Sequence, residues 1–207
     1  MNNITRFLSQ YIPNIPQFSY PWELLEFFKN NQEWGADFTK HYGKWATVGD
    51  LKISMGENVE IQPYVTLSGL IIMGKNCRVG PYSILRGVVL LGDNVSIGPH
   101  CEICRSILMD NVFLGHKNIV LDSILCDKVK LAAHVCTSNV PVGKEYITAC
   151  YDGKRLPYKG KYGAMVDHDC WLGTNTCTMP GTYIKPHTEY IGHTIICGMG
   201  KEKPFYR

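Results

Sequence analysis

The chain has 207 residues, 45% of them hydrophobic and 19% charged, with a formal net charge of +3. This length and composition are typical of one globular domain with a small appendage, and so small a charge excess gives no reason to expect nucleic acid as a partner. The first residues, MNNITRFLSQYIPNIPQ, carry prolines and polar side chains where a signal peptide needs an apolar run, and no apolar run approaches the roughly 20 residues of a membrane span. We therefore expect a cytoplasmic protein without a membrane segment.

Residues 1–47 lack the repeat that fills most of the chain. They contain the stretch PWELLEFFKNNQEW, in which Pro21 suits the first turn of a helix and the following leucines and phenylalanines supply an apolar face. We predict that residues 1–47 form a small helical cap over the first coil of the domain that follows.

Within residues 48–197 an apolar residue recurs at every sixth position, with one-residue contractions after Ile103 and an interruption before the repeat resumes at Val166. The interval is unbroken over nine hexads, at Met55, Ile61, Leu67, Met73, Val79, Leu85, Leu91, Ile97 and Ile103. Neither a helix, with a period of 3.6, nor a strand, with a period of 2, repeats every six residues. Hexapeptide repeats indicate a parallel β-helix, in which each triangular coil takes about 18 residues and neighbouring coils stack about 4.8 Å apart.

Two further positions of the hexad fit this interpretation. Glycine often follows the aliphatic residue, as at Gly98 and Gly115, and a small or β-branched residue often lies four positions after it, as at Val95 and Cys101. Glycine permits a tight corner, and the small side chains must point inward with the aliphatic ones. We predict an all-β fold, a left-handed parallel β-helix of about five to six coils.

Two segments interrupt or end the repeat. Residues 139–163 are rich in turn formers and basic side chains, and we expect a long inserted loop. Residues 198–207 form a C-terminal tail, which is open to two interpretations: a frayed end, or a cationic, aromatic flap over a neighbouring subunit's site.

Histidine is the side chain best suited to accept a proton near neutral pH. Of the seven histidines, His116 directly follows the corner residue Gly115 in LGHKN, so its side chain should project from an edge of the prism. His100 and His134 should occupy comparable outward places one coil to either side. A solid prism has no internal pocket, so a ligand must bind on its outside or between prisms.

From Val48 to about Ile195 the sequence resembles the left-handed β-helix domain of sugar-1-phosphate nucleotidyltransferases of the N-acetylglucosamine-1-phosphate uridyltransferase type. The stretches YSILRGVVLLGDNVSIGPHCEICRSIL, LGHKNIVLDSIL and KYGAMVDHDCWLGTNTCTMPG carry the resemblance. It implies a hexapeptide-repeat acyltransferase that uses acetyl-CoA as co-substrate, needs no metal, and binds a sugar-type ligand between the subunits of a homotrimer. The nucleotidyltransferase half has no counterpart here, because no G-x-G-T phosphate-binding loop occurs.

The resemblance also implies roles for individual residues. His116 matches the general base, and the substrate-binding residues it suggests are Arg86 and Asn139, with Arg105 and Lys130 as further polar groups for an anionic substrate. For acetyl-CoA it points to Ala133, Thr174 and Gly192, with Lys201 and Lys203 near the phosphates. The family's Lys, Tyr, Asn and Tyr at four sugar-contacting positions are replaced by Cys104, Ile119, Lys130 and Val140. We therefore expect an acceptor other than glucosamine-1-phosphate.

Three other interpretations remain open. Cys101 and Cys104 form a C-x-x-C pair, but with an inward and an outward side chain and no second pair they make a poor zinc site. Zinc between subunits, as in carbonic anhydrases of this fold, would need a second histidine five residues after His116, where Leu121 stands. A catalytically inactive trimer that serves oligomerisation or ligand sensing is the third.

Overall fold

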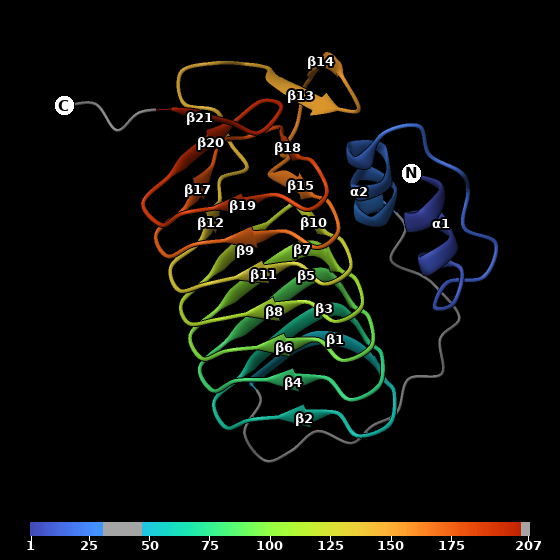
Figure 1. The fold of residues 1–207 in the computed structure, drawn as a ribbon. Helices are drawn as coiled ribbons and strands as arrows, with labels where there is room; N and C mark the ends of the chain where they lie inside the picture. Colours follow the sequence, from blue (N-terminus) through green and yellow to red (C-terminus); the bar gives the residue numbers. More distant parts are fainter. Residues whose placement is uncertain (31–46, 204–207) are drawn as a thin grey trace.

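The computed structural model describes residues 1–30 and 47–203, which form a left-handed parallel β-helix with two short helices beside it (Figure 1). The helices are α1 (Asn2–Leu8) and α2 (Pro21–Asn30). The first ten strands are β1 (Thr47–Met55), β2 (Glu60–Ile61), β3 (Thr66–Met73), β4 (Arg78–Val79), β5 (Ile84–Leu91), β6 (Ser96–Ile97), β7 (Glu102–Leu108), β8 (Phe113–Leu114), β9 (Ile119–Leu121) and β10 (Ile124–Leu125). They continue as β11 (Lys130–Leu131), β12 (Cys136–Thr137), β13 (Ile147–Tyr151), β14 (Lys154–Tyr158), β15 (Ala164–Val166), β16 (Trp171–Leu172), β17 (Cys177–Thr178), β18 (Thr182–Ile184), β19 (Glu189–Tyr190), β20 (Ile195–Cys197) and β21 (Lys201–Lys203).

The prism has three faces of stacked parallel strands. On the first face the order is β1-β3-β5-β7-β9-β12-β17-β20. The long strands β1, β3, β5 and β7 continue onto the second face, where β10, β15 and β18 extend the stack, and the third face is the sheet β2-β4-β6-β8-β11-β16-β19. The predicted β-helix is confirmed, but the predicted five to six coils are too few, since there are about eight. The additional coils are formed by the hexads after residue 103 and by those after the inserted segment.

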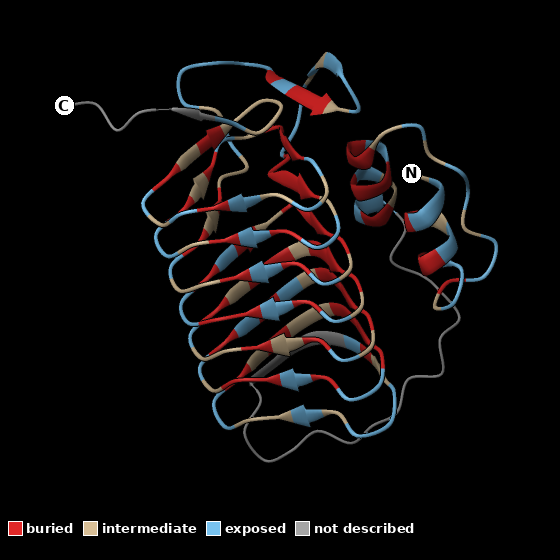
Figure 2. Cartoon of the chain, viewed as in Figure 1, coloured by how far each residue is buried: buried red, intermediate tan, exposed pale blue. Residues whose placement is uncertain are grey.

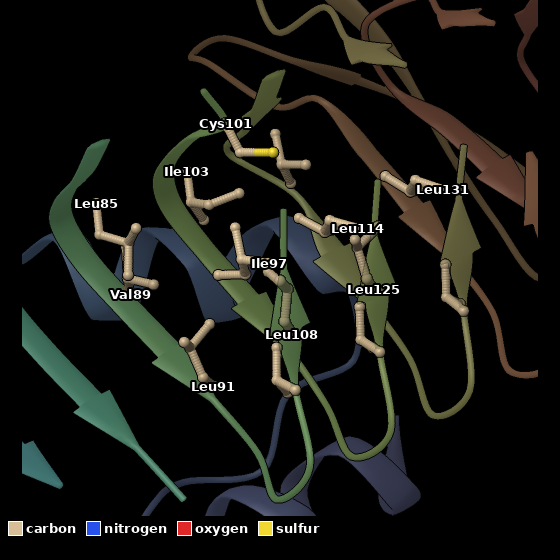
Figure 3. Packing of buried hydrophobic residues seen from close by; sticks show 14 of the residues in the cluster. Leu85, Val89, Leu91, Ile97, Cys101, Ile103, Leu108, Leu114, Leu125 and Leu131 are labelled. Atoms are coloured by element: carbon tan, nitrogen blue, oxygen red, sulfur yellow. The ribbon is translucent and has the colours of Figure 1, made fainter. Parts of the chain in front are cut away.

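The predicted inward positions form the inner core. Leu85, Leu91, Ile97, Ile103 and Leu114 are 0% to 1% exposed and pack in layers along the axis (Figure 3). Buried residues recur at the same place in each coil along the prism (Figure 2). Each coil buries an apolar interior that a single coil could not shield from water, so the stack is stabilised by contacts between neighbouring coils.

The three corners of the prism differ in their side chains. The histidine corner joins the third face to the first and contains His116; the arginine corner joins the first face to the second and contains Gly87, Arg105 and Asp122. The asparagine corner joins the second face to the third, and its amides form a ladder from Asn58 through Asn76 and Asn94 to Asn111 with 3.1–3.3 Å bonds. Each corner turns through a residue with positive φ, a conformation that asparagine tolerates better than most.

The outer side of the second face is also apolar and is covered. Leu70, Ile72, Val88 and Leu90 on the long strands pack against buried residues of both helices and of the inserted segment. Strands buried on both sides read as continuous apolar runs, as in GLIIM and GVVLL. The prediction that the helices cover the first coil is therefore wrong in its placement, because they pack against the side of the prism (Figure 1). The remainder of the predicted cap, residues 31–46, lies outside the described residues.

The inserted segment and the tail have more structure than predicted. Residues 139–163 contain the antiparallel hairpin β13–β14, which turns at Asp152 and Gly153 with φ of 44° and 79°. In the tail, β21 pairs antiparallel with β20, so residues 201–203 are not a frayed end. No helix in the described part of the chain is long and apolar enough to cross a membrane.

Candidate functional site

His116 lies at the histidine corner, directly after β8. The stacked backbones favour glycine next to it, since a Cβ on Gly115 would lie 3.0 Å from the carbonyl carbon of Ala132 in the next coil, a tight approach. The His116 side chain is exposed, and its imidazole forms no hydrogen bond with any residue that the structure describes. Its backbone carbonyl accepts a 2.9 Å bond from the amide of His134 in the next coil.

Three of the predicted acetyl-CoA contacts stack above His116. The amide of Asn175 donates to the Ala133 carbonyl at 3.0 Å, and that of His193 donates to the Thr174 carbonyl at 2.7 Å. These bonds place His116, Ala133, Thr174 and Gly192 at the same turn position of four successive coils. We call these four residues the amide strip, since none of their N–H groups has an acceptor in the described structure.

Lower coils carry proline at the turn position of the amide strip. The amides of Tyr82, His100 and Lys117 donate to the carbonyls of Pro63, Pro81 and Pro99, in the same pattern as above. Proline has no N–H, so the corner changes at His116 from a row without donors to a row of N–H groups that have no acceptor among the described residues. The aromatic residues beside the prolines stack on one another, with 4.9 Å between the rings of Tyr64 and Tyr82 and 5.0 Å between those of Tyr82 and His100.

Two of the predicted substrate residues, Arg105 and Asn139, meet at the arginine corner instead. Arg105 donates to both carboxylate oxygens of Asp122, from Nε at 2.6 Å and from Nη2 at 2.8 Å, and Asn139 donates to the same carboxylate. Only 7% of the Asp122 side chain is exposed, so its charge is neutralised by a close bidentate pair. Arg86, on the first face, donates to Glu102 from Nε at 2.9 Å and from Nη2 at 2.6 Å.

The first face separates these residues from His116. Six residues of extended chain run from His116 to Asp122, which places the two corners roughly 15 to 20 Å apart. Within one chain, the predicted base and the predicted substrate groups Arg86, Arg105 and Asn139 therefore do not form one site. The structure brings the base together with three acetyl-CoA contacts at one corner, and Arg105 together with Asn139 at another.

The remaining predicted residues lie elsewhere. Lys130 is on the third face, with its Nζ 5.7 Å from the ring centre of Trp171. Lys201 lines a cavity of about 450 Å³ with Lys144 and Arg155, and the Lys203 side chain lies outside the described residues. Cys101 belongs to the inner core, whereas Cys104 is buried outside it. Among residues 1–30 and 47–203, no group of three or more His, Cys, Asp or Glu side chains is arranged to hold a metal ion.

Two further histidines, which the sequence analysis did not single out, lie at the asparagine corner. His168 Nδ1 is 3.0 Å from Asp167 Oδ1, and His187 Nδ1 is 2.9 Å from Asp169 Oδ2. The hydrogen bond with His187 lowers the pKa of Asp169. Both histidines line a cavity of about 430 Å³ beside α1. A carboxylate on Nδ1 orients an imidazole for proton transfer, so this corner is a rival location for a base.

Comparisons with known proteins agree with the repeat. The profile "Bacterial transferase hexapeptide (six repeats)" matches residues 70–105. No curated protein matches the chain.

Several solved structures are similar over most of the chain. A hexapeptide transferase family protein from Anaplasma phagocytophilum shares 12% identity over 78% of this chain and 84% of its own, with a TM-score of 0.39. The N-acyltransferase AntD from Bacillus cereus, in complex with dTDP and coenzyme A, shares 16% over 74% and 83%, with a TM-score of 0.26. A GDP-perosamine N-acetyltransferase from Caulobacter crescentus, in complex with CoA and GDP-perosamine, shares 12% over 78% and 55%, with a TM-score of 0.28. At these values the likenesses do not show what the chain does.

Proposed function

We propose that the chain is an acyl-CoA-dependent acetyltransferase that acts on a sugar, sugar phosphate or nucleotide-sugar, with His116 as the general base. The observation that carries the proposal is the amide strip. Its exposed His116 imidazole and the N–H groups of Ala133, Thr174 and Gly192 have no hydrogen-bond partner in the part of the chain that the structure describes. The hexapeptide repeat, matched independently over residues 70–105, supports it.

The amide strip fits the pantetheine arm of acyl-CoA. That arm is a narrow chain with two amide carbonyls, which need N–H donors when they leave water. Ala133, Thr174 and Gly192 present such donors one coil apart, about 4.8 Å, and their small side chains leave the corner open to a ligand. The lower coils, with proline at this position, lack these donors. We therefore place acyl-CoA along the upper coils with its thioester near His116.

The chemistry that follows is direct acyl transfer. His116 takes the proton from an acceptor hydroxyl or amine as that atom attacks the thioester carbonyl. The tetrahedral intermediate collapses, the C–S bond breaks, and the CoA thiolate leaves and takes up the proton from the imidazolium. The exposed imidazole, which no described residue holds by a hydrogen bond, can face the acceptor hydroxyl or amine directly.

The acceptor side of the site requires a second chain in this proposal. Arg86, Arg105 and Asn139 are the groups that the sequence suggests for the substrate, and they lie across the first face from His116 in the same chain. In a homotrimer, the arginine corner of one chain can approach the histidine corner of its neighbour. Light scattering tests this part: a mass near three chains is expected, and a mass near 23.4 kDa, that of one chain, would contradict a site between subunits.

Three alanine variants test the base. Release of CoA from acetyl-CoA would be followed by chromatography against a panel of amino-sugars, sugar phosphates and nucleotide-sugars. We expect His116→Ala to lower turnover by about 10²-fold or more, whereas His134→Ala, an equally exposed control in the next coil, retains it. A loss confined to His187→Ala would move the base to the asparagine corner. Absence of both turnover and acetyl-CoA binding would favour the inactive, oligomerisation or ligand-sensing interpretation.

A further inference from the structure

Two cysteines lie side by side on the outside of the prism. Cys136 in β12 and Cys177 in β17 are direct partners in the parallel register. Both are partly exposed. Their strand neighbours Val135, Thr137, Thr176 and Thr178 are fully buried, and since side chains alternate along a strand, both thiols point outward.

The thiols interact with each other. The interaction between the two thiol groups lowers the pKa of Cys177 to about 7 and raises that of Cys136. The thiolate is the nucleophilic form of cysteine, so this lowered pKa favours reaction of the pair with an electrophile near neutral pH, with Cys136 as the second sulfur.

No other cysteine shares this environment. Six of the nine are buried, namely Cys77, Cys101, Cys104, Cys126, Cys150 and Cys170, and burial raises the pKa of each. Cys197 is the remaining partly exposed one. Cys197 therefore serves as a control thiol of the same exposure class as Cys136 and Cys177.

The spacing selects the kind of ligand. The two side chains leave adjacent, in-register parallel strands in the same direction, so their Cβ atoms lie about as far apart as the strands, about 4.8 Å. The Cβ atoms of a disulfide lie about 3.8 Å apart, so a direct sulfur–sulfur bond requires these two Cβ atoms to move together. A bridging atom bonded to both sulfurs spans the wider gap. A closed zinc site needs four ligands, and the described residues offer no group of three or more.

From this geometry we propose that Cys136 and Cys177 form a two-thiolate site for soft, thiophilic electrophiles such as trivalent arsenic. Soft ligands of this kind select soft ions. With phenylarsine oxide, two As–S bonds form, and the oxygen leaves as water with the proton of the remaining thiol and one proton from the solvent. No oxidant is consumed. The site is independent of the proposed acyl transfer, since it uses none of the residues of the amide strip.

Native mass spectrometry with phenylarsine oxide tests the site. We expect one phenylarsenic adduct per chain, removed by a dithiol and not by a monothiol, with at least a tenfold loss of adduct in Cys136→Ser and in Cys177→Ser and full retention in Cys197→Ser. An adduct that persists in the first two variants, or disappears in the third, overturns the proposal.

A second experiment uses the protein without substitutions, so it does not depend on whether a variant folds. It measures whether the arsenical protects cysteines from alkylation. The native protein would be treated with phenylarsine oxide and then with N-ethylmaleimide, and the labelled peptides would be identified. We expect Cys136 and Cys177 to be protected together while Cys197 remains labelled. Equal labelling of Cys136 and Cys177 with and without the arsenical would contradict the site.

Discussion

The substitution Ala133→Pro removes one donor of the amide strip and is expected to leave the backbone in place. Pro63, Pro81 and Pro99 already occupy the same turn position in lower coils, and Gln62 shows that a residue other than glycine can precede proline there. A proline at a compatible site stabilises a fold by about 0.4 to 1 kcal/mol, because it restricts the unfolded chain. We therefore expect the melting temperature to stay the same or rise slightly.

The same substitution should weaken acetyl-CoA binding. Loss of one neutral hydrogen bond removes about 0.5 to 1.5 kcal/mol, which corresponds to roughly a 2- to 13-fold increase in Kd. Isothermal titration calorimetry with acetyl-CoA measures it, with Pro99→Ala as the control at the same turn position below the strip. If Ala133→Pro binds acetyl-CoA as tightly as the unmodified chain, the Ala133 amide does not hold the co-substrate.

Three further predictions concern stability, the arginine corner and the thiols. Leu114→Ala should lower the free energy of unfolding by about 2 to 5 kcal/mol in urea denaturation, because Leu114 is 0% exposed in the inner core; a change below 1 kcal/mol would contradict the layered packing. Asp122→Ala leaves the Arg105 charge without its carboxylate in a half-buried place and should lower stability more than Glu102→Ala, which frees the more exposed Arg86; equal losses in thermal melts would contradict this ranking. Alkylation of Cys177 by iodoacetamide should increase with pH and reach half its limiting rate near pH 7, since its pKa is lowered to about 7, and a midpoint near the ordinary 8.5 would count against the interaction between the two thiols.

The inner core was predictable because it depends on one periodicity. Positions such as Leu85 and Leu91 follow from the interval of six, and the structure buries them completely. The outer core, on the covered side of the second face, has a different signal in the same segments. Runs such as GLIIM are apolar at adjacent positions, a sign of burial on both sides, and this signal indicates a covered second face. Which element covers it depends on packing between helices and sheet, which no local pattern encodes.

The hairpin and the histidine pair also left signals in the sequence. Asp152-Gly153 between two short runs is typical of a two-residue hairpin turn. Asp169 and His187 are 18 residues apart, one coil of the repeat, so a stacked pair could be expected from spacing alone. Cys136 and Cys177 are different: the insertion lies between them, and their register depends on how much of it remains within the coil.

The separation of His116 from Arg105 and Asn139 was not visible from residue matching. Matching assigns roles one position at a time, whereas the corner on which a residue lies depends on the count of residues around each coil. One-residue contractions of the hexad after Ile103 change that count. The predicted site therefore divides between two corners of one chain, and only assembly of several chains could reunite it.

A crystal structure of the protein with coenzyme A bound would show whether the amide strip holds the co-substrate. We expect density for the pantetheine arm along Ala133, Thr174 and Gly192, with its amide carbonyls facing their N–H groups and its sulfur near His116. Density in the cavity beside His168 and His187, or away from the histidine corner altogether, would contradict it.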